Sequence, residues 1–214
     1  MNYRTLLLLL AMPLAALTMW AQDDVPTINP QAYYMGADGF EEESSSYSGN
    51  APLNARFVAN AENTAGWAAN YEWHFNLENE STPYLIRYEE DTQFTFTQAG
   101  THYIRLYATF VQGNDTIAYT DDYWSDAQPL TLTISESKLE MPNAFSPNGK
   151  EPNDIYRAKP TYQSIVEFHA VIFNRWGQKL YEWDDPAGGW DGTYHGKPVA
   201  QGVYFVLVRA KGAD

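Results

Sequence analysis

The chain has 214 residues, with 13 basic and 27 acidic side chains, a formal net charge of −14 and no cysteine. So acidic a surface repels nucleic acid and anionic lipid, which excludes DNA, RNA and acidic membrane surfaces as expected partners. Without cysteine the chain has neither disulfides nor a cysteine-linked lipid anchor, so buried apolar side chains must stabilise the fold, and the length is sufficient for two small cores.

The first 22 residues have the pattern of a secretory signal peptide. Arg4 precedes an almost wholly apolar run over residues 5–17, and Ala21 is followed by a polar, acidic segment. The apolar run, about 13 residues long, is shorter than the roughly 20 that a membrane-spanning helix needs. We therefore predict cleavage near Ala21 or Gln22 and no membrane-spanning segment after cleavage.

Residues 23–50 have the composition of a linker. Pro26 and Pro30 interrupt the segment, and residues 36–49 are rich in Glu, Ser and Gly. Aromatic residues argue against complete disorder, and residues 32–35 are a candidate edge strand. We expect residues 23–50 to be mostly a loop-rich, acidic linker.

The pattern from residue 51 to residue 136 is that of β-strands. Apolar and polar side chains alternate over residues 53–59, 71–75, 93–97 and 102–111. In the last of these runs, one face carries His102, Ile104, Leu106, Ala108 and Phe110. Further strands are expected at residues 116–120 and 130–134, and no stretch shows helical spacing.

The distribution of charge marks a boundary after this segment. Residues 23–136 contain 18 acidic and 3 basic side chains, whereas residues 137–214 contain nine of each. Composition and strand pattern change at the same place. We therefore predict two domains, residues 51–136 and residues 139–214, joined near residues 135–141.

Three short blocks within residues 51–136 match a known type of domain. They are Ala51-Pro52-Leu53 with Phe57, then Tyr71-Glu72-Trp73-His74-Phe75, and then Ala99-Gly100-Thr101-His102. Together they resemble a PKD-type immunoglobulin-like domain, although residues 76–79 replace the Gly-Asp-Gly turn that this family commonly has after its Trp-Asp-Phe strand. The resemblance implies an antiparallel β-sandwich that binds a surface protein or a glycan.

Residues 139–214 also alternate short strands with turns. Strand-forming residues cover residues 166–173 and 179–183, the segment between them supplies Asn and Gly for a tight turn, and a last strand follows at residues 203–210. This pattern predicts a small antiparallel sandwich, so the predicted fold class is all-β, with two antiparallel immunoglobulin-like β-sandwich domains. Trp176 and Trp190 are expected to fill the second core or to pack over its turns.

Four ordered blocks lie within residues 139–214. Their residues are Pro142, Asn143, Phe145, Pro147, Asn148, Gly149, Asn153, Asp154, Phe173, Asn174, Arg175, Trp176, Gly177, Trp190, Asp191, Gly192, Gly202 and Tyr204. These blocks resemble the type B C-terminal sorting domain of the bacterial type IX secretion system, also called the gliding-motility-associated C-terminal domain. The resemblance implies that residues 139–214 are an export address, with the type IX secretion machinery as partner and with passage through the periplasm to the cell surface or the extracellular space.

The resemblance also bears on the last strand. Members of the sorting-domain family continue with one further strand after the position of residues 203–210. The resemblance therefore implies a chain that is truncated at its last strand or an abbreviated signal, and residues 203–210 are expected to form an open sheet edge.

The sequence has no pattern of catalytic residues, so we predict no catalytic residue, no cofactor and no metal site. The four histidines are scattered, which is typical of satisfied core or surface histidines rather than of zinc ligands. Neither a nucleophile elbow nor a phosphate-binding loop occurs. The acidic runs at residues 41–43, 89–91 and 121–122 are consecutive, so neighbouring carboxylates in a strand would point to opposite faces.

Two short segments have alternative interpretations. Residues 148–154 are the best candidate for a calcium loop, but Lys150 and Glu151 replace the Asp-Gly pair of the sorting-domain family, and the alternative is a turn in which Asn and Asp bond their own backbone. Asp115-Thr116-Ile117 resembles the O-glycosylation motif of the Bacteroidetes, and its alternative is an ordinary strand start.

These patterns indicate two classes of function. The first is a non-enzymatic secreted or cell-surface protein, exported by its C-terminal domain, whose immunoglobulin-like module serves adhesion or ligand binding. The second is a structural or assembly protein of the cell envelope, because residues 174–177 and 190–204 also resemble the immunoglobulin-like module of flagellar hook-capping proteins. The signal peptide argues against the flagellar version.

Overall fold

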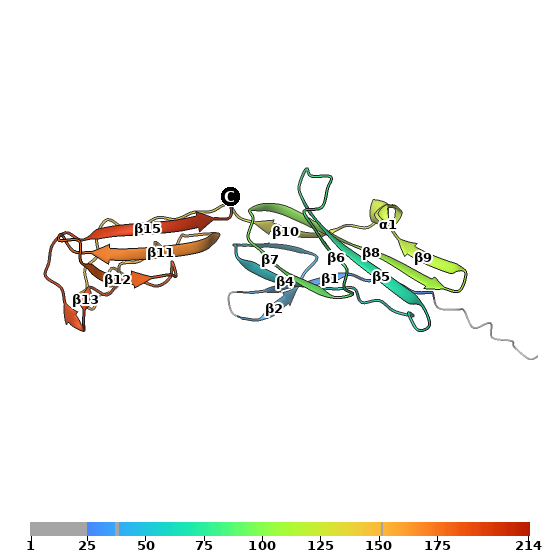
Figure 1. Ribbon diagram of the computed structural model, residues 1–214, viewed down its shortest axis with the longest axis horizontal. Helices are drawn as coiled ribbons and strands as arrows, with labels where there is room; N and C mark the ends of the chain where they lie inside the picture. The colour runs from blue at the N-terminus through green and yellow to red at the C-terminus, as the bar shows by residue number, and fades with distance from the viewer. Residues whose placement is uncertain (1–24, 37–38, 151) are drawn as a thin grey trace, which may run out of the picture.

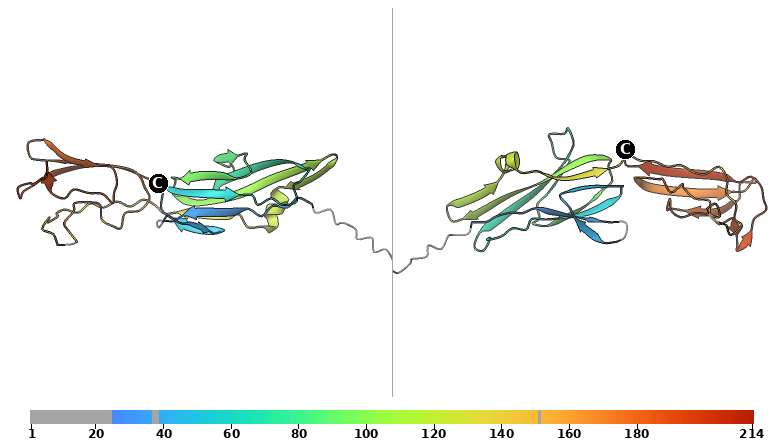
Figure 2. Two further views of the ribbon diagram at one scale, coloured as in Figure 1. Left: turned by 90° about the horizontal axis from the view of Figure 1, so that it is seen from below. Right: turned by 180° about the vertical axis from the view of Figure 1, so that it is seen from behind.

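The computed structural model describes residues 25–36, 39–150 and 152–214, so the predicted signal peptide at residues 1–22 lies outside the described residues. The described chain contains fifteen β-strands and one short α-helix, which confirms the predicted all-β fold class. Figures 1 and 2 show two β-rich parts placed end to end. No helix among the described residues has the length and apolar character needed to cross a membrane.

Two sheets face each other in the first part (Figure 1). One sheet has the strand order β2 (Glu41–Glu43), β1 (Gln31–Met35), β4 (Leu53–Val58) and β7 (Thr92–Phe96). The other has the order β3 (Ser46–Gly49), β10 (Leu130–Ile134), β8 (Gly100–Gln112), β5 (Ala68–Leu77) and β6 (Leu85–Arg87), and β9 (Asp115–Tyr119) pairs with β8. The β3–β10 pair is parallel, and the other pairs of these two sheets are antiparallel.

Aromatic side chains fill the space between the two sheets. The ring of Phe57 lies 5.8 Å from that of Trp73, 5.3 Å from that of Phe75 and 6.2 Å from that of Phe96, measured between centroids, and all four side chains are fully buried. The face predicted from alternation is also buried, with His102, Ile104, Leu106, Ala108 and Phe110 in the core. Burial of each large apolar side chain stabilises the fold by about 1.5–3 kcal/mol.

The prediction that residues 23–50 are mostly a linker is wrong. This segment supplies β1, β2 and β3, and the candidate edge strand is β1, which lies between β2 and β4. Tyr34 is fully buried, and its ring stacks on that of Tyr47 with the centroids 4.5 Å apart. The composition led to the wrong prediction because Glu and Ser occupy solvent-facing positions of these strands, while Tyr34 is buried in the core and Tyr47 packs against it.

The sequence pattern also missed the helix α1 (Asp121–Asp126). Six residues are too few for an amphipathic period to appear, and none of them is buried. The helix is held by its neighbours, because Trp124 Nε1 donates a hydrogen bond to the Leu106 carbonyl oxygen at 3.1 Å.

The second part is built on a three-stranded antiparallel sheet with the order β12 (Lys179–Trp183), β11 (Ile165–Phe173) and β15 (Phe205–Gly212). In the same part, β13 (Thr193–Tyr194) and β14 (Lys197–Pro198) form a separate two-stranded antiparallel hairpin. Phe168, Ala170 and Ile172 of β11 are buried in the hydrophobic cluster of this part. Within the described residues β15 pairs with β11 alone, so it lies at the sheet edge, as the sequence predicted.

Hydrogen bonds tie the two parts together around Ser164. The Ser164 Oγ atom accepts from the Ala51 amide at 3.1 Å, and the Ser164 carbonyl oxygen accepts from the Ala213 amide at 3.1 Å. The Ala213 carbonyl oxygen in turn accepts from the Ala99 amide at 2.9 Å, and Ala213 is buried in the hydrophobic cluster of the first part. Apart from Ala213, the buried residues of the two hydrophobic clusters lie on opposite sides of residues 135–141 in the sequence, which supports the domain boundary that we propose there.

His102 is a buried histidine with both ring nitrogens hydrogen-bonded. Its Nε2 atom lies 2.9 Å from the Gln98 carbonyl oxygen and its Nδ1 atom lies 2.8 Å from the Tyr84 hydroxyl. A carbonyl oxygen only accepts, so Nε2 carries the proton and donates, and the Tyr84 hydroxyl donates to Nδ1. Burial lowers the pKa of His102, against an opposing effect of the bond to Gln98.

We predict that the free energy of unfolding decreases as the pH falls below about 6.5, the ordinary pKa of histidine. The unfolded chain takes up a proton on His102 in that range while the folded chain resists it, so acid favours the unfolded state. Urea unfolding between neutral and mildly acidic pH should show a weaker pH dependence in His102→Gln than in the wild type. His195→Gln, at an exposed position, is the control; an unchanged pH dependence in His102→Gln would contradict the prediction.

Candidate functional site

Half of the predicted motif residues gather around one groove of the second part. The groove has a cavity volume of about 830 Å³. The predicted residues that line it are Pro142, Asn143, Phe145, Pro147, Trp190, Asp191, Gly192, Gly202 and Tyr204. Segments far apart in the sequence therefore build one surface.

Trp190 holds these segments together. It is 1% exposed, and its ring centroid lies 5.4 Å from that of Phe145 and 5.3 Å from that of Tyr204. Its backbone pairs with Tyr156 in both directions, at 2.8 and 3.0 Å, and its Nε1 atom donates to the Thr193 carbonyl oxygen at 2.8 Å. The prediction that Trp190 belongs to the core is confirmed.

Asp191 and Gly192 shape the floor of the groove beside Trp190. Asp191 Oδ1 accepts from the amide of Thr193 at 2.9 Å and from its hydroxyl at 2.8 Å, which fixes the turn. Gly192 has a φ of +80°, and a Cβ atom at this position would lie 2.9 Å from Pro147 Cγ. Only glycine combines that backbone conformation with so close an approach, so the Trp-Asp-Gly block has a structural explanation.

The described residues of the candidate calcium loop, 148–150 and 152–154, are joined by hydrogen bonds. Asp154 Oδ1 accepts from the Asn148 amide at 2.8 Å and from the Gly149 amide at 2.9 Å, and Asn148 Oδ1 accepts from the Lys150 amide at 3.0 Å. The Asn153 carbonyl oxygen accepts from the amide of Ser146 at 2.7 Å, which closes the loop. These bonds are those of the turn alternative, and within the described part of the chain no three His, Asp or Glu side chains gather as metal ligands.

The turn between β11 and β12 presents Trp176 to solvent. Asn174 Oδ1 accepts from the amides of Trp176 and Gln178, both at 3.0 Å, and Gly177 adopts a φ of +80°. Trp176 is 76% exposed, and the guanidinium carbon of Arg175 lies 4.4 Å from its ring centroid. The expectation that Trp176 fills the core or packs over its turns is therefore wrong, because Trp176 lies within the turn that the Asn174 side chain fixes and its own side chain is exposed to solvent.

Phe173 is the last residue of β11 and directly precedes the turn that carries Trp176. It is half-buried at the end of β11 and is paired in register with Phe205 of β15. Phe205 and Leu207 are exposed on the same strand, while Val206 and Val208 pack against the core. The sequence alternation indicated this strand but not which of its two faces is covered.

The arrangement presents a groove and an exposed turn, and it is suited to recognition. The turn carries a cation stacked on an indole ring, a pair that commonly anchors protein interfaces. Aromatic, aliphatic and small polar residues line the groove, and its titratable lining residues are limited to Asp191 and two tyrosines. Of those, burial raises the pKa of Tyr156, so its hydroxyl stays protonated as a donor.

Residues 139–214 match the family model described as CHU_C Type IX secretion signal domain. No curated protein matches the chain. The match confirms the resemblance stated from the sequence: residues 139–214 are a type IX secretion signal domain, which directs export through the outer membrane to the cell surface or the extracellular space and implies an interaction with the type IX secretion machinery.

The two tryptophans of the motif should differ in their effect on stability. We predict that Trp190→Ala lowers the free energy of unfolding by about 3–5 kcal/mol, because it empties the centre of the second core. Trp176→Ala should change it by no more than about 0.5 kcal/mol, since the side chain is solvent-exposed. Urea unfolding followed by circular dichroism measures both, and equal losses in the two variants would contradict the structure of this motif.

Proposed function

We propose that this protein is a non-enzymatic cargo of the type IX secretion system that acts at the cell surface or outside the cell. In this proposal residues 139–214 are the address, and the PKD-like module, residues 51–136 together with the strands β1–β3, carries the activity as adhesion or ligand binding. The observation that carries the proposal is the type IX secretion signal domain at residues 139–214.

The contacts of the acidic side chains support a non-enzymatic role. Asp91 Oδ1 accepts a hydrogen bond from the Ala59 amide at 3.1 Å, and Asp121 Oδ1 accepts from the Tyr107 hydroxyl at 2.7 Å. Glu41 is paired with Arg56, and this pairing lowers the pKa of its carboxyl. Each of these carboxylates is hydrogen-bonded within the first part, and Glu41, which lines a surface pocket, is paired there with Arg56 rather than with a second carboxylate, as a catalytic pair would require.

The exposed turn is the part of the address that we assign to recognition by the secretion machinery. Arg175 and Trp176 offer a stacked cation and ring at a tip that the Asn174 side chain already fixes, so docking costs little conformational entropy. The buried motif residues, such as Trp190 and Gly192, then act by building the fold that presents the tip.

This assignment predicts that export and stability separate at Trp176. In a type IX host, Trp176→Ala of the whole chain should reach the surface about tenfold less than the wild type, or less still, as expected when an interface loses a central tryptophan. Surface labelling of intact cells, with the total amount of protein measured in parallel, provides the comparison.

Tyr88→Ala is the matched control, because Tyr88 is 65% exposed on the first part and lies outside the address. This variant should be exported normally. Normal export of Trp176→Ala would overturn the role of the turn, whereas a loss that is matched by reduced stability would assign Trp176 to folding.

A further inference from the structure

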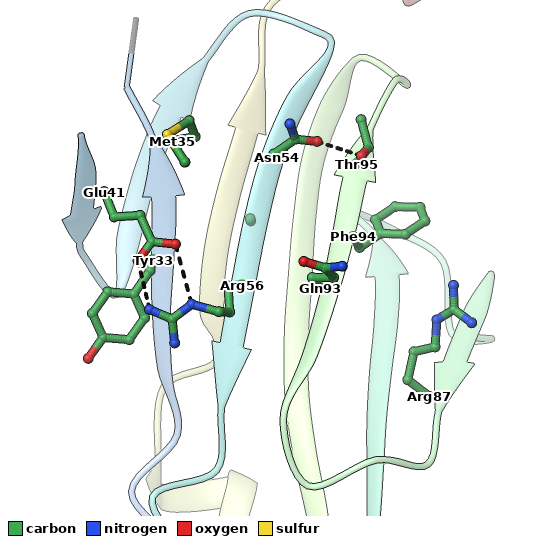
Figure 3. Close-up of a pocket in the computed structure, with 10 residues that line it drawn as sticks. Tyr33, Met35, Glu41, Asn54, Arg56, Arg87, Gln93, Phe94 and Thr95 are labelled. Atoms are coloured by element: carbon green, nitrogen blue, oxygen red, sulfur yellow. Dashed lines mark hydrogen bonds and ion pairs between the residues drawn. The ribbon is translucent and has the colours of Figure 1, made fainter. Parts of the chain in front are cut away.

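The outer face of the sheet β2–β1–β4–β7 contains a second hollow, which we call the outer pocket. Tyr33, Glu41, Asn54, Arg56, Gln93 and Thr95 line it from this sheet, and Arg87 of β6, a strand of the facing sheet, lines it as well. Its volume is about 620 Å³. Figure 3 shows Arg56 and Arg87 toward opposite sides of the pocket with Gln93 between them. Residues 23–136 contain only three basic side chains against 18 acidic ones, and two of the three lie in this pocket.

The charge of Arg56 is already compensated. Its Nη2 atom donates to Glu41 Oε2 at 2.7 Å and its Nε atom donates to Glu41 Oε1 at 3.3 Å, which is a bidentate pair. The guanidinium also lies 4.3 Å from the ring centroid of Tyr33. These contacts fix the arginine in place, so it offers the pocket a rigid N–H edge without a net charge.

Arg87 differs from Arg56 in its hydrogen bonding. Its Nε atom is shielded from solvent and has no hydrogen-bond partner among the residues that the structure describes. The Arg87 side chain lines the outer pocket and has no ion pair within the described part of the chain, whereas Arg56 is paired with Glu41. Arg87 is therefore the cation in the outer pocket at which an anionic oxygen gains most.

Neutral hydrogen-bonding groups occupy the space between the two arginines. Gln93 of β7 is paired in register with Arg56 of β4, and Thr95 is paired with Asn54. The Thr95 hydroxyl donates to Asn54 Oδ1 at 2.5 Å, so the Asn54 amide keeps its two N–H donors for a ligand. The outer pocket is thus rich in donors, with one uncompensated cation at one side.

We propose that the outer pocket binds a saccharide that bears a carboxylate, with the carboxylate at Arg87 and sugar hydroxyls along Gln93 and Asn54. One cation and a row of amides match a ring that carries one charge and several hydroxyls. An acidic peptide fits less well, because its repeated charges would meet Glu41, which lines the pocket beside Arg56, and Glu42 and Glu43 of the same strand. The inference deepens the ligand-binding part of the proposed function and rests on it.

The test is calorimetric titration of the purified protein with three uronate trisaccharides, built from galacturonate, glucuronate or mannuronate. At least one should bind, and its neutral methyl ester should bind about tenfold more weakly or worse, since a charge-assisted hydrogen bond is lost. Added salt should weaken binding of the acid more than that of the ester.

Arg87→Gln should reduce the affinity for the bound uronate about tenfold or more, with an unchanged thermal unfolding midpoint. Arg105→Gln is the matched control, because it removes the same charge from the third basic residue of this region, outside the pocket, and should change affinity less than about twofold. No binding by any of the three acids at millimolar concentration, equal binding of the ester, equal effects of the two substitutions, or tighter binding of a poly-glutamate peptide would each overturn the proposal. Because the assay involves no export step, its failure leaves the export function untouched.

Discussion

Aromatic packing is the interaction on which the rest of this structure depends, because a chain without cysteine has no covalent cross-link to hold its layers together. In the first part the rings around Phe57 join the two sheets. In the second part Trp190, between Phe145 and Tyr204, joins segments that no regular sheet connects. The motif of the secretion signal domain is therefore first of all a packing motif, and the turn that we propose for recognition is what this packing leaves exposed.

Hydrogen bonds and one buried residue join the two parts at their junction. Ser164 bonds to the first part through the Ala51 amide, and Ala213 returns to the hydrophobic cluster of that part. Figure 1 shows β11 running away from this junction, so the turn that follows it, with Trp176, lies at the far end of the molecule. The turn that we propose for recognition therefore lies at one end, while the outer pocket lies in the first part.

Much of the fold was predictable because burial on one side of a strand produces alternation, as in β4, β5 and β8. Only a candidate strand at residues 32–35 was predicted in the segment before residue 51, because composition does not show that Glu-rich β2 pairs with β1 and that Ser-rich β3 pairs with β10, with Tyr34 stacked on Tyr47. The order of the blocks in the sequence identified the motif residues, but it did not show which of them are packed and which are exposed. Position 192 requires glycine because its backbone lies close to Pro147, and Trp176 is exposed because it lies in the turn that Asn174 fixes. Both facts depend on the three-dimensional structure and cannot be predicted from the local sequence. The outer pocket left no sequence signal, since its residues come from separate strands.

The central claim is that residues 139–214 send this protein through the outer membrane by the type IX route. The most direct measurement is protease accessibility of the protein on intact cells of a type IX host, compared with a derivative that lacks the outer-membrane channel of the system, with a periplasmic protein as the control for cell integrity. The account predicts digestion on the intact host and full protection, with accumulation in the periplasm, in the derivative. Equal digestion in both strains would contradict it.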